Sequence, residues 1–546
     1  MKKYFYFLVT FFAVVLFALT NIGILHAQKK PIELRWGVEW DVATLDPIQQ
    51  QTNWDFMLAV NLYDTLIYPD LEKGHIPWIA ESWKISPDGM KYTFRIKKGI
   101  PFHDGTDVTA EDVSFSMWRM LKLEGPAASN FTSLKPESSK ALDKYTVEFN
   151  LTKKDPSFMA ALFTFKVMSK GMILKNKEEG KYGEFGDLGV KYLQTHDAGS
   201  GPFTVAEKKP GDYVRLKRFE NYPFYQRKPG SIDFITVYII PEMVTIGAKL
   251  RKGELDMCTW GLPYQVQNKL KESKNFVVEE IYPPVPWYVF MNNKKKPFDC
   301  PYVRKAVAYA YDFETVTTKI LPGGKRLQGP VPEVLRGGCT GIETYPFDLE
   351  KAKAMLSKSK YSLEELKQFN LDIASVAGSE RFKNTALLLS TNLKKIGLNA
   401  QVKTIRIVDI NQAAAKPETA FHLVVYMQAA RVPHPHFYLV YYTPEGSGTA
   451  WAPGGIYYEN TKVTEAISMA KNSLDPADQR KYYCQAQKQI AEDCPIIFSH
   501  EEFRLVPFWR YVKGFKYPVA CMFFELRFES YTMDTEDPLF KENHGW

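Results

Sequence analysis

Two periodicities in the placement of apolar side chains run through this 546-residue chain, and together they predict a mixed α/β protein. Residues 91–98, KYTFRIKK, alternate polar and apolar side chains, which is the pattern of a half-buried strand. Residues 379–397, SERFKNTALLLSTNLKKIG, instead repeat apolar side chains at helical spacing and end on a glycine, a natural helix stop. The strand-like residues 398–405, LNAQVKTI, follow directly. This alternation of helix and strand is typical of two-lobed α/β folds.

Residues 97–113, KKGIPFHDGTDVTAEDV, contain a histidine and four acidic groups, a density that is seen in metal and acid–base sites. Each polar residue nevertheless has a structural task. Asp104–Gly105 supplies the positive φ angle that a tight turn requires. Thr109 is a helix N-cap, and Glu111 follows it in the first turn, where the helix dipole favours an acid. We therefore interpret the segment as a strand–turn–helix junction and expect no role for His103 or Glu111 in ligand binding.

Composition and charge narrow the class of protein. Apolar residues make up 45% of the chain and charged residues 24%, which is ordinary for a globular protein, and the length predicts two or three lobes. The net charge of +8 is spread along the chain without a dense basic block, so we expect no nucleic-acid partner. The six cysteines form no CxxC motif, which argues against zinc-ribbon and thioredoxin-like sites. Cys484 and Cys494 would close the shortest disulfide loop, but the spacing leaves the pairing open.

The N-terminus has the pattern of an export signal. Lys2 and Lys3 precede a long apolar run, and a small residue, Ala27, stands at a plausible cleavage position. We expect residues 1–27 to be a signal peptide, with an uncleaved membrane anchor as the alternative. No cysteine precedes Cys258, which excludes a lipid-modified N-terminal cysteine. The pattern therefore predicts a periplasmic protein that is not a lipoprotein.

A long stretch around the junction resembles a known family. Residues 79–121, IAESWKISPDGMKYTFRIKKGIPFHDGTDVTAEDVSFSMWRML, are similar to the signature of family 5 extracytoplasmic solute-binding proteins, the peptide/nickel-type receptors of ABC importers. Four further segments resemble the same family: WDVATLDP at 40–47, GSGPFTVAEKKPGDYVRLKRFENY at 199–222, KPFDCPYVRKAVAYAYDFETV at 296–316 and DPADQRKYYCQAQKQIAEDCPIIF at 475–498. The resemblance extends over almost the whole predicted mature chain.

The resemblance implies the two-lobed periplasmic binding protein fold with an extra inserted lobe. Carried onto this chain, lobe I comprises residues 28–63, 198–297 and 506–546, lobe II residues 64–197, and lobe III residues 298–505. Ligand would lie between lobes I and III, which close by a hinge motion. The resemblance also implies a monomeric receptor, without catalysis or a cofactor, that delivers a small solute to an inner-membrane ABC permease and its ATPase.

The most informative departure from the family lies in residues 426–439, YMQAARVPHPHFYL. Peptide-binding relatives carry a motif like W..DY.DP here, whose first aspartate pairs with the ligand's ammonium group. Alignment on Pro435 places Arg431 at that aspartate and His434 at the second. An arginine suits a carboxylate, because its planar fork can form a bidentate pair. We therefore expect a carboxylate-bearing ligand, which includes modified peptides.

His436 supports an alternative ligand, because it occupies the place where nickel-type relatives contact a metal complex, and neutral imidazole suits nickel. The alternative function is therefore a receptor for nickel or another metal–chelator complex. A surface loop with solvated histidines is equally open. A secreted metal-dependent hydrolase that uses His434 and His436 is disfavoured, since the chain has no HExxH and no GxSxG motif.

Four aromatic residues complete the candidate site, and each could either stack on a ligand or belong to a core. They are Trp40, Trp260, Tyr288 and Trp451.

Overall fold

The computed structural model describes most of the chain: residues 30–50, 52–70, 73–155, 157–258, 261–335, 337, 339–428, 432, 434–444, 446, 455–473, 475–517 and 526–546. The expected signal peptide, residues 1–27, lies outside these ranges. Within them, no helix has the length and apolar character that crossing a membrane requires.

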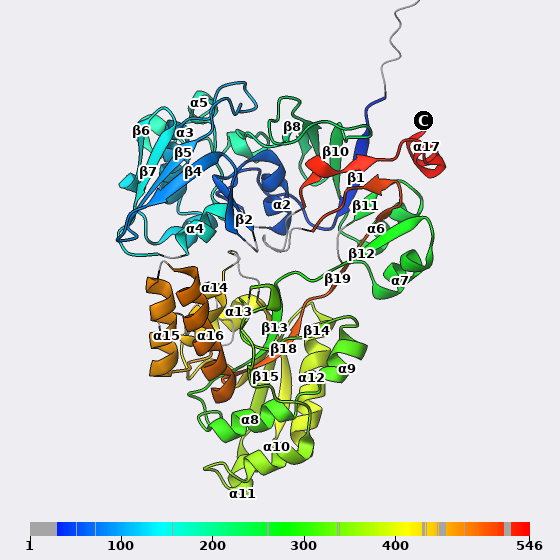
Figure 1. Cartoon of the computed structure of the whole chain (residues 1–546). Helices are drawn as coiled ribbons and strands as arrows, with labels where there is room; N and C mark the ends of the chain where they lie inside the picture. Colours follow the sequence, from blue (N-terminus) through cyan, green and yellow to red (C-terminus); the bar gives the residue numbers. More distant parts are fainter. Residues whose placement is uncertain are drawn as a thin grey trace, which may run out of the picture.

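Three larger sheets organise the fold, beside two sheets of two strands each, and Figure 1 shows two of the larger sheets in the upper half of the molecule and the third in the lower half. Lobe I has a seven-stranded sheet in the order β12-β19-β11-β1-β10-β9-β8. Its central strand β1 is almost fully buried, and Trp36 of this strand packs edge-on against Trp54 of the following helix α2. The elements are β1 (Glu33–Val38), α2 (Asn53–Leu62), β8 (Phe203–Lys209), β9 (Tyr213–Arg218), β10 (Phe234–Ile239), α6 (Met243–Arg251), β11 (Met257–Cys258), α7 (Tyr264–Glu272), β12 (Phe276–Ile281), β19 (Arg504–Trp509) and α17 (Pro538–His544).

Lobe II is built on a four-stranded antiparallel sheet in the order β4-β5-β7-β6 and confirms the expected strand–turn–helix junction. Gly105 has a φ of +84°, and Thr109 caps helix α3 by accepting a hydrogen bond from the backbone N–H of Asp112. The elements are β2 (Ile67–Asp70), β3 (Gly74–Pro77), β4 (Ala80–Ile85), β5 (Lys91–Ile96), α3 (Ala110–Leu123), β6 (Ser139–Asp143), β7 (Thr146–Asn150), α4 (Phe158–Ala161) and α5 (Lys170–Lys175).

Lobe III has a six-stranded sheet in the order β14-β18-β13-β17-β15-β16, with helices on both faces. Helices α8, α10 and α12 pack on one face, and α15 and α16 pack on the other. The expected helix and strand are present as α12 and β16. The elements are β13 (Pro286–Met291), α8 (Pro301–Tyr309), β14 (Lys325–Arg326), α10 (Leu349–Leu356), α11 (Leu363–Gln368), β15 (Leu371–Val376), α12 (Glu380–Lys395), β16 (Ala400–Ile405), α13 (Ile407–Ala413), β17 (Leu423–Met427), α14 (His436–Leu439), α15 (Thr461–Asn472), α16 (Pro476–Asp493) and β18 (Ile496–Glu501).

The sheet pairing moves two of the lobe boundaries expected from the sequence. Strand β13 was assigned to lobe I, but it pairs with β17 and β18 of the lobe III sheet. The chain therefore crosses between lobes at residues 282–285, before β13, and not at 297. It returns at residues 502–503, between β18 and β19, because β19 pairs with β12 in lobe I. A family motif marks similar residues, whereas strand pairing decides to which sheet they belong.

The disulfide is Cys339–Cys484, with a Cα–Cα distance of 5.3 Å, and not the short Cys484–Cys494 loop. Cys484 lies within α16 and Cys494 is its C-cap, so a rise of ten helical positions separates them by about 15 Å, which is too far for a disulfide. Cys258, Cys300 and Cys494 are buried free thiols.

We expect the double substitution Cys339→Ser, Cys484→Ser to lower the free energy of unfolding by about 2–4 kcal/mol, because the bridge closes a long loop of the unfolded chain. Urea unfolding of the oxidised protein and of the double variant measures this difference. Cys300→Ser is the control, because its thiol is buried but unbridged. Equal midpoints for the double variant and the wild type would contradict the prediction.

Candidate functional site

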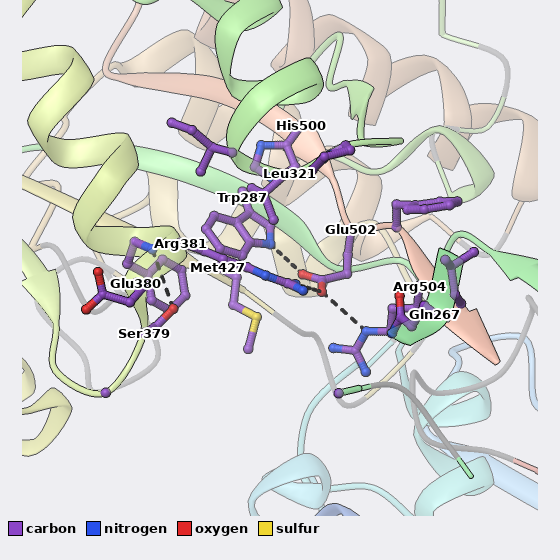
Figure 2. Close-up of a pocket in the computed structure, with 17 residues that line it drawn as sticks. Gln267, Trp287, Leu321, Ser379, Glu380, Arg381, Met427, His500, Glu502 and Arg504 are labelled. Carbon is purple, nitrogen blue, oxygen red and sulfur yellow. Dashed lines mark hydrogen bonds and ion pairs between the residues drawn. The ribbon is translucent and has the colours of Figure 1, made fainter. Parts of the chain in front are cut away.

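A cavity of about 530 Å³ lies where the chain crosses between lobes I and III. We call it the interlobe cavity; Figure 2 shows its lining side chains. Lobe I contributes Gly261, Gln267, Arg504 and Leu505, and the crossover segment contributes Glu502 and Phe503. Lobe III contributes Trp287, Ile320, Leu321, Pro322, Gly378, Ser379, Glu380, Arg381, Phe382, Met427 and His500. Walls from both lobes are what a site that closes around a ligand requires.

Trp287 forms the aromatic wall of the interlobe cavity. It lies opposite His500 in the β13–β18 register, and the centroids of the two rings are 4.8 Å apart. Phe382, in the first turn of α12, packs against the indole with a centroid distance of 4.3 Å. The indole Nε1–H donates to Glu502 Oε2 at 2.5 Å, which ties the wall to the crossover segment.

Two cationic groups of the interlobe cavity lie around Glu502, whereas the cavity's other carboxylate, Glu380, is exposed and pairs with Lys383. Glu502 Oε1 lies 3.4 Å from Arg504 Nε and 3.8 Å from Arg381 Nη1, and Trp287 occupies its other oxygen. Burial lowers the pKa of the Arg504 guanidinium, and the charge of Glu502 opposes this effect. The Arg381 side chain is 52% exposed, whereas those of Glu502 and Arg504 are nearly buried. The cavity therefore has a cation at its open side and a buried carboxylate that is already engaged.

Glu39 of lobe I is a further acidic group that interacts with Arg504, although it does not itself line the cavity. It directly follows β1, and burial raises the pKa of its carboxyl group. Its own backbone N–H and the positive charge of Arg504 act in the opposite direction. The charge of Glu39 thus acts on Arg504 from the lobe I side.

The candidate residues chosen from the sequence fall in different places. Arg431, Trp260 and Trp451 lie outside the described residues. Trp40 is 60% exposed and does not line the interlobe cavity. Tyr288 is 2% exposed, and its hydroxyl donates to the Pro330 carbonyl at 2.6 Å. Tyr288 is therefore a core residue, which corrects its assignment to the ligand site.

The alternation of strand β13 explains this correction. Trp287 and Val289 pack in the core on one face of the lobe III sheet, whereas Tyr288 and Phe290 pack in the core on the other face. Successive side chains of a strand point to opposite faces, so a shift of one residue exchanges cavity and core. The aromatic residue chosen from the sequence, Tyr288, is therefore the direct neighbour of the one that lines the cavity, Trp287.

His434 and His436 lie together at the start of α14, but neither lines the interlobe cavity. The backbone N–H of His436 donates to His434 Nδ1 at 3.2 Å, and both rings adjoin Tyr483 of α16. Burial, together with the charges of His436 and His75, lowers the pKa of His434 to about 3. His434 is therefore a half-buried ring that is neutral at physiological pH.

The described part of the chain contains no group of three or more His, Cys, Asp or Glu residues that could hold a metal ion. The cavity residues that sequence reasoning missed are Trp287, Arg381, Phe382, His500, Glu502 and Arg504.

The comparisons with known proteins identify the family. The model for bacterial extracellular solute-binding proteins, family 5 Middle, matches residues 75–449, more than half of the chain. The chain belongs to this family. Its members are extracytoplasmic, and a disulfide is typical of that oxidising environment.

Individual relatives of this family 5 protein agree in length and fold. The probable D,D-dipeptide-binding periplasmic protein DdpA of Escherichia coli is 27% identical, over 94% of this chain and 97% of the relative. A glutathione-binding protein of Escherichia coli is 26% identical, over 83% of this chain and 86% of the relative. The binding protein CtaP of Listeria monocytogenes has a TM-score of 0.79 at 22% identity and covers 92% of this chain and 100% of its own. The peptide-bound DppA of Helicobacter pylori has a TM-score of 0.72 at 23% identity and covers 93% of this chain and 99% of its own. These structures confirm the expected lobed binding-protein fold.

Proposed function

We propose that this family 5 protein captures a small peptide-like or carboxylate-bearing solute in the interlobe cavity and delivers it to an inner-membrane ABC permease with its ATPase. The observation that carries the proposal is the charge arrangement of the cavity. Arg381 is half-exposed at the cavity, while the buried carboxylate, Glu502, already accepts the indole N–H and faces Arg504. A ligand carboxylate thus finds a cation, whereas a ligand ammonium finds no unengaged oxygen on Glu502.

Binding would act by closing the lobes and not by chemistry. Only two segments of the described chain, residues 282–285 and 502–503, cross between the sheets of lobes I and III, and such short crossings can serve as hinges. A ligand that contacts both walls stabilises the closed form by its differential affinity. Purified protein should therefore release no product from ester or peptide substrates.

Substitution of Arg381 tests the proposal. With dipeptides as ligands, Arg381→Ala should weaken binding by about tenfold or more, because a hydrogen-bonded charge pair contributes about 1.5–3 kcal/mol. The matched control is Lys394→Ala, on the same helix but exposed and outside the cavity. Titration calorimetry with free-acid dipeptides and their C-terminal amides gives the dissociation constants. Equal binding of acids and amides by the wild type would contradict a carboxylate ligand.

A nickel or other metal–chelator complex is the alternative ligand, supported by the proximity of His434 and His436. A solved structure of NikZ from Campylobacter jejuni with Ni(L-His) has the same fold, with a TM-score of 0.72. Mass spectrometry of the solute that co-purifies with the mature protein separates the two ligand classes.

Export should remove residues 1–27 and leave Gln28 at the N-terminus of a periplasmic protein, because a lysine pair, an apolar run and Ala27 form a cleavable signal. N-terminal sequencing of the exported protein checks this expectation. A membrane-bound form that retains Met1 would show that the apolar run is an anchor.

A further inference from the structure

His500 is a buried polar side chain that lines the interlobe cavity with one ring nitrogen unused. It is 1% exposed, and its Nδ1 lies 2.8 Å from the hydroxyl oxygen of Ser499. Its Nε2 is buried and has no hydrogen-bond partner among the described residues. Because a buried polar atom without a partner is unfavourable, this nitrogen is suited to a group that enters the cavity.

A hydrogen-bonded chain behind His500 determines where the ring proton lies. The Tyr311 hydroxyl is 2.5 Å from Ser499 Oγ, its only hydrogen-bond contact in the described structure, and burial raises the pKa of Tyr311, so it keeps its proton. Tyr311 therefore donates to Ser499. Ser499 could also accept from the ring, but its own buried proton would then have no acceptor among the described residues, so this proton is donated to His500 Nδ1. The opposite polarity would leave the buried Tyr311 proton without an acceptor. The neutral ring of His500 thus carries its proton on Nε2.

The charge around His500 selects what this N–H can bind. Burial, together with the positive charge of Arg381, lowers the pKa of His500 to about 3, so the ring is neutral at physiological pH. The positive field of Arg381 that disfavours an imidazolium favours an anionic acceptor beside the same ring. An ammonium or amide N–H at this position would instead meet a donor.

We propose that His500 is a specificity-determining residue of the interlobe cavity, whose Nε2–H donates to a carboxylate oxygen of the bound solute. The inference rests on the proposed function, because it assumes a carboxylate ligand in this cavity. It assigns the recognition of that group to a neutral donor in addition to Arg381, and it makes Tyr311 and Ser499 positioning residues for the donor.

The binding test uses two probes: an equimolar mixture of dipeptides as free acids and the same mixture as C-terminal amides. His500→Phe keeps an aromatic ring against Trp287 but removes the N–H. We expect this variant to bind the free acids about tenfold or more weakly than the wild type and the amides within about twofold. Unchanged binding of the acids by a folded His500→Phe protein would overturn the inference. A wild-type protein that binds neither mixture would overturn the proposed function itself and, with it, the ligand assignment of His500.

The tautomer can be tested without any ligand. Nitrogen NMR of full-length mature protein with labelled histidine, in which the His500 signal is assigned by its loss in His500→Phe, should show the proton on Nε2. Tyr311→Phe should weaken the preference for Nε2, because Ser499 then loses the donor that directs its own hydroxyl proton toward the ring. A wild-type ring protonated on Nδ1 would overturn the inference whatever the dipeptides do.

Discussion

Replacing His103 with alanine should lower the free energy of unfolding by about 3–5 kcal/mol and leave ligand affinity nearly unchanged. The ring of His103 in lobe II forms an ion pair through Nδ1 with Asp197, and its Nε2 donates to the Gly201 carbonyl at 2.9 Å. The two side chains are only 3% and 4% exposed. The substitution would therefore leave a buried carboxylate without its cation, and neither residue of the pair lines the interlobe cavity.

The same pair predicts a pH dependence. Burial acts to lower the pKa of His103, but Asp197 outweighs it and raises this pKa above 6.5. Burial acts to raise the pKa of Asp197, but His103 and backbone N–H groups lower it below 3.8. The contribution of His103 is present below pH 6.5 and is lost as pH rises through its folded pKa. That of Asp197 is present above pH 3.8 and is lost as pH falls through its folded pKa. The pair thus stabilises the fold most between these two values.

Urea unfolding of the wild type and of His103→Ala at a pH within this window measures the loss of stability. Repeating the unfolding in more alkaline and in more acidic solution measures the pH dependence. Glu111→Ala is the matched control, because Glu111 belongs to the same junction but is exposed and pairs with Lys170 at the surface. It should change stability by less than about 1 kcal/mol. A selective loss of ligand binding in His103→Ala, with the melting temperature unchanged, would instead assign His103 to the ligand site.

Arg431→Ala should weaken ligand binding by about 2–5 kcal/mol, or about thirtyfold to several thousandfold, if Arg431 forms a desolvated pair with the ligand's carboxylate. The expectation rests on the family motif, in which an arginine stands at the aspartate of peptide-binding relatives. Arg431→Lys should restore only part of the affinity, since a point charge cannot reproduce the bidentate fork.

Calorimetry with the co-purified solute measures the effect of Arg431. Arg406→Ala is the control, because Arg406 is exposed in lobe III and pairs with Asp409. A structure of the liganded protein in which the Arg431 guanidinium faces solvent on the outer surface of lobe III would contradict the prediction. The receptor assignment would remain.

The sequence by itself determined the features that depend on neighbours along the chain. Alternation predicted β5, helical spacing predicted α12, and turn and capping residues predicted the junction before α3. These patterns are readable because burial on one face and backbone capping involve residues only a few positions apart. The same locality made the family signature recognisable.

Tertiary structure decided the features that join distant residues. His103 meets Asp197, and Cys339 meets Cys484, only after lobes and helices have packed. Strand β13 is buried on both faces in the folded protein, and its pairing with β18 decides that Trp287 and not its neighbour faces the interlobe cavity. A local pattern reports that a face is buried and not what lies against it, so the composition of the cavity wall depends on which elements the fold brings together.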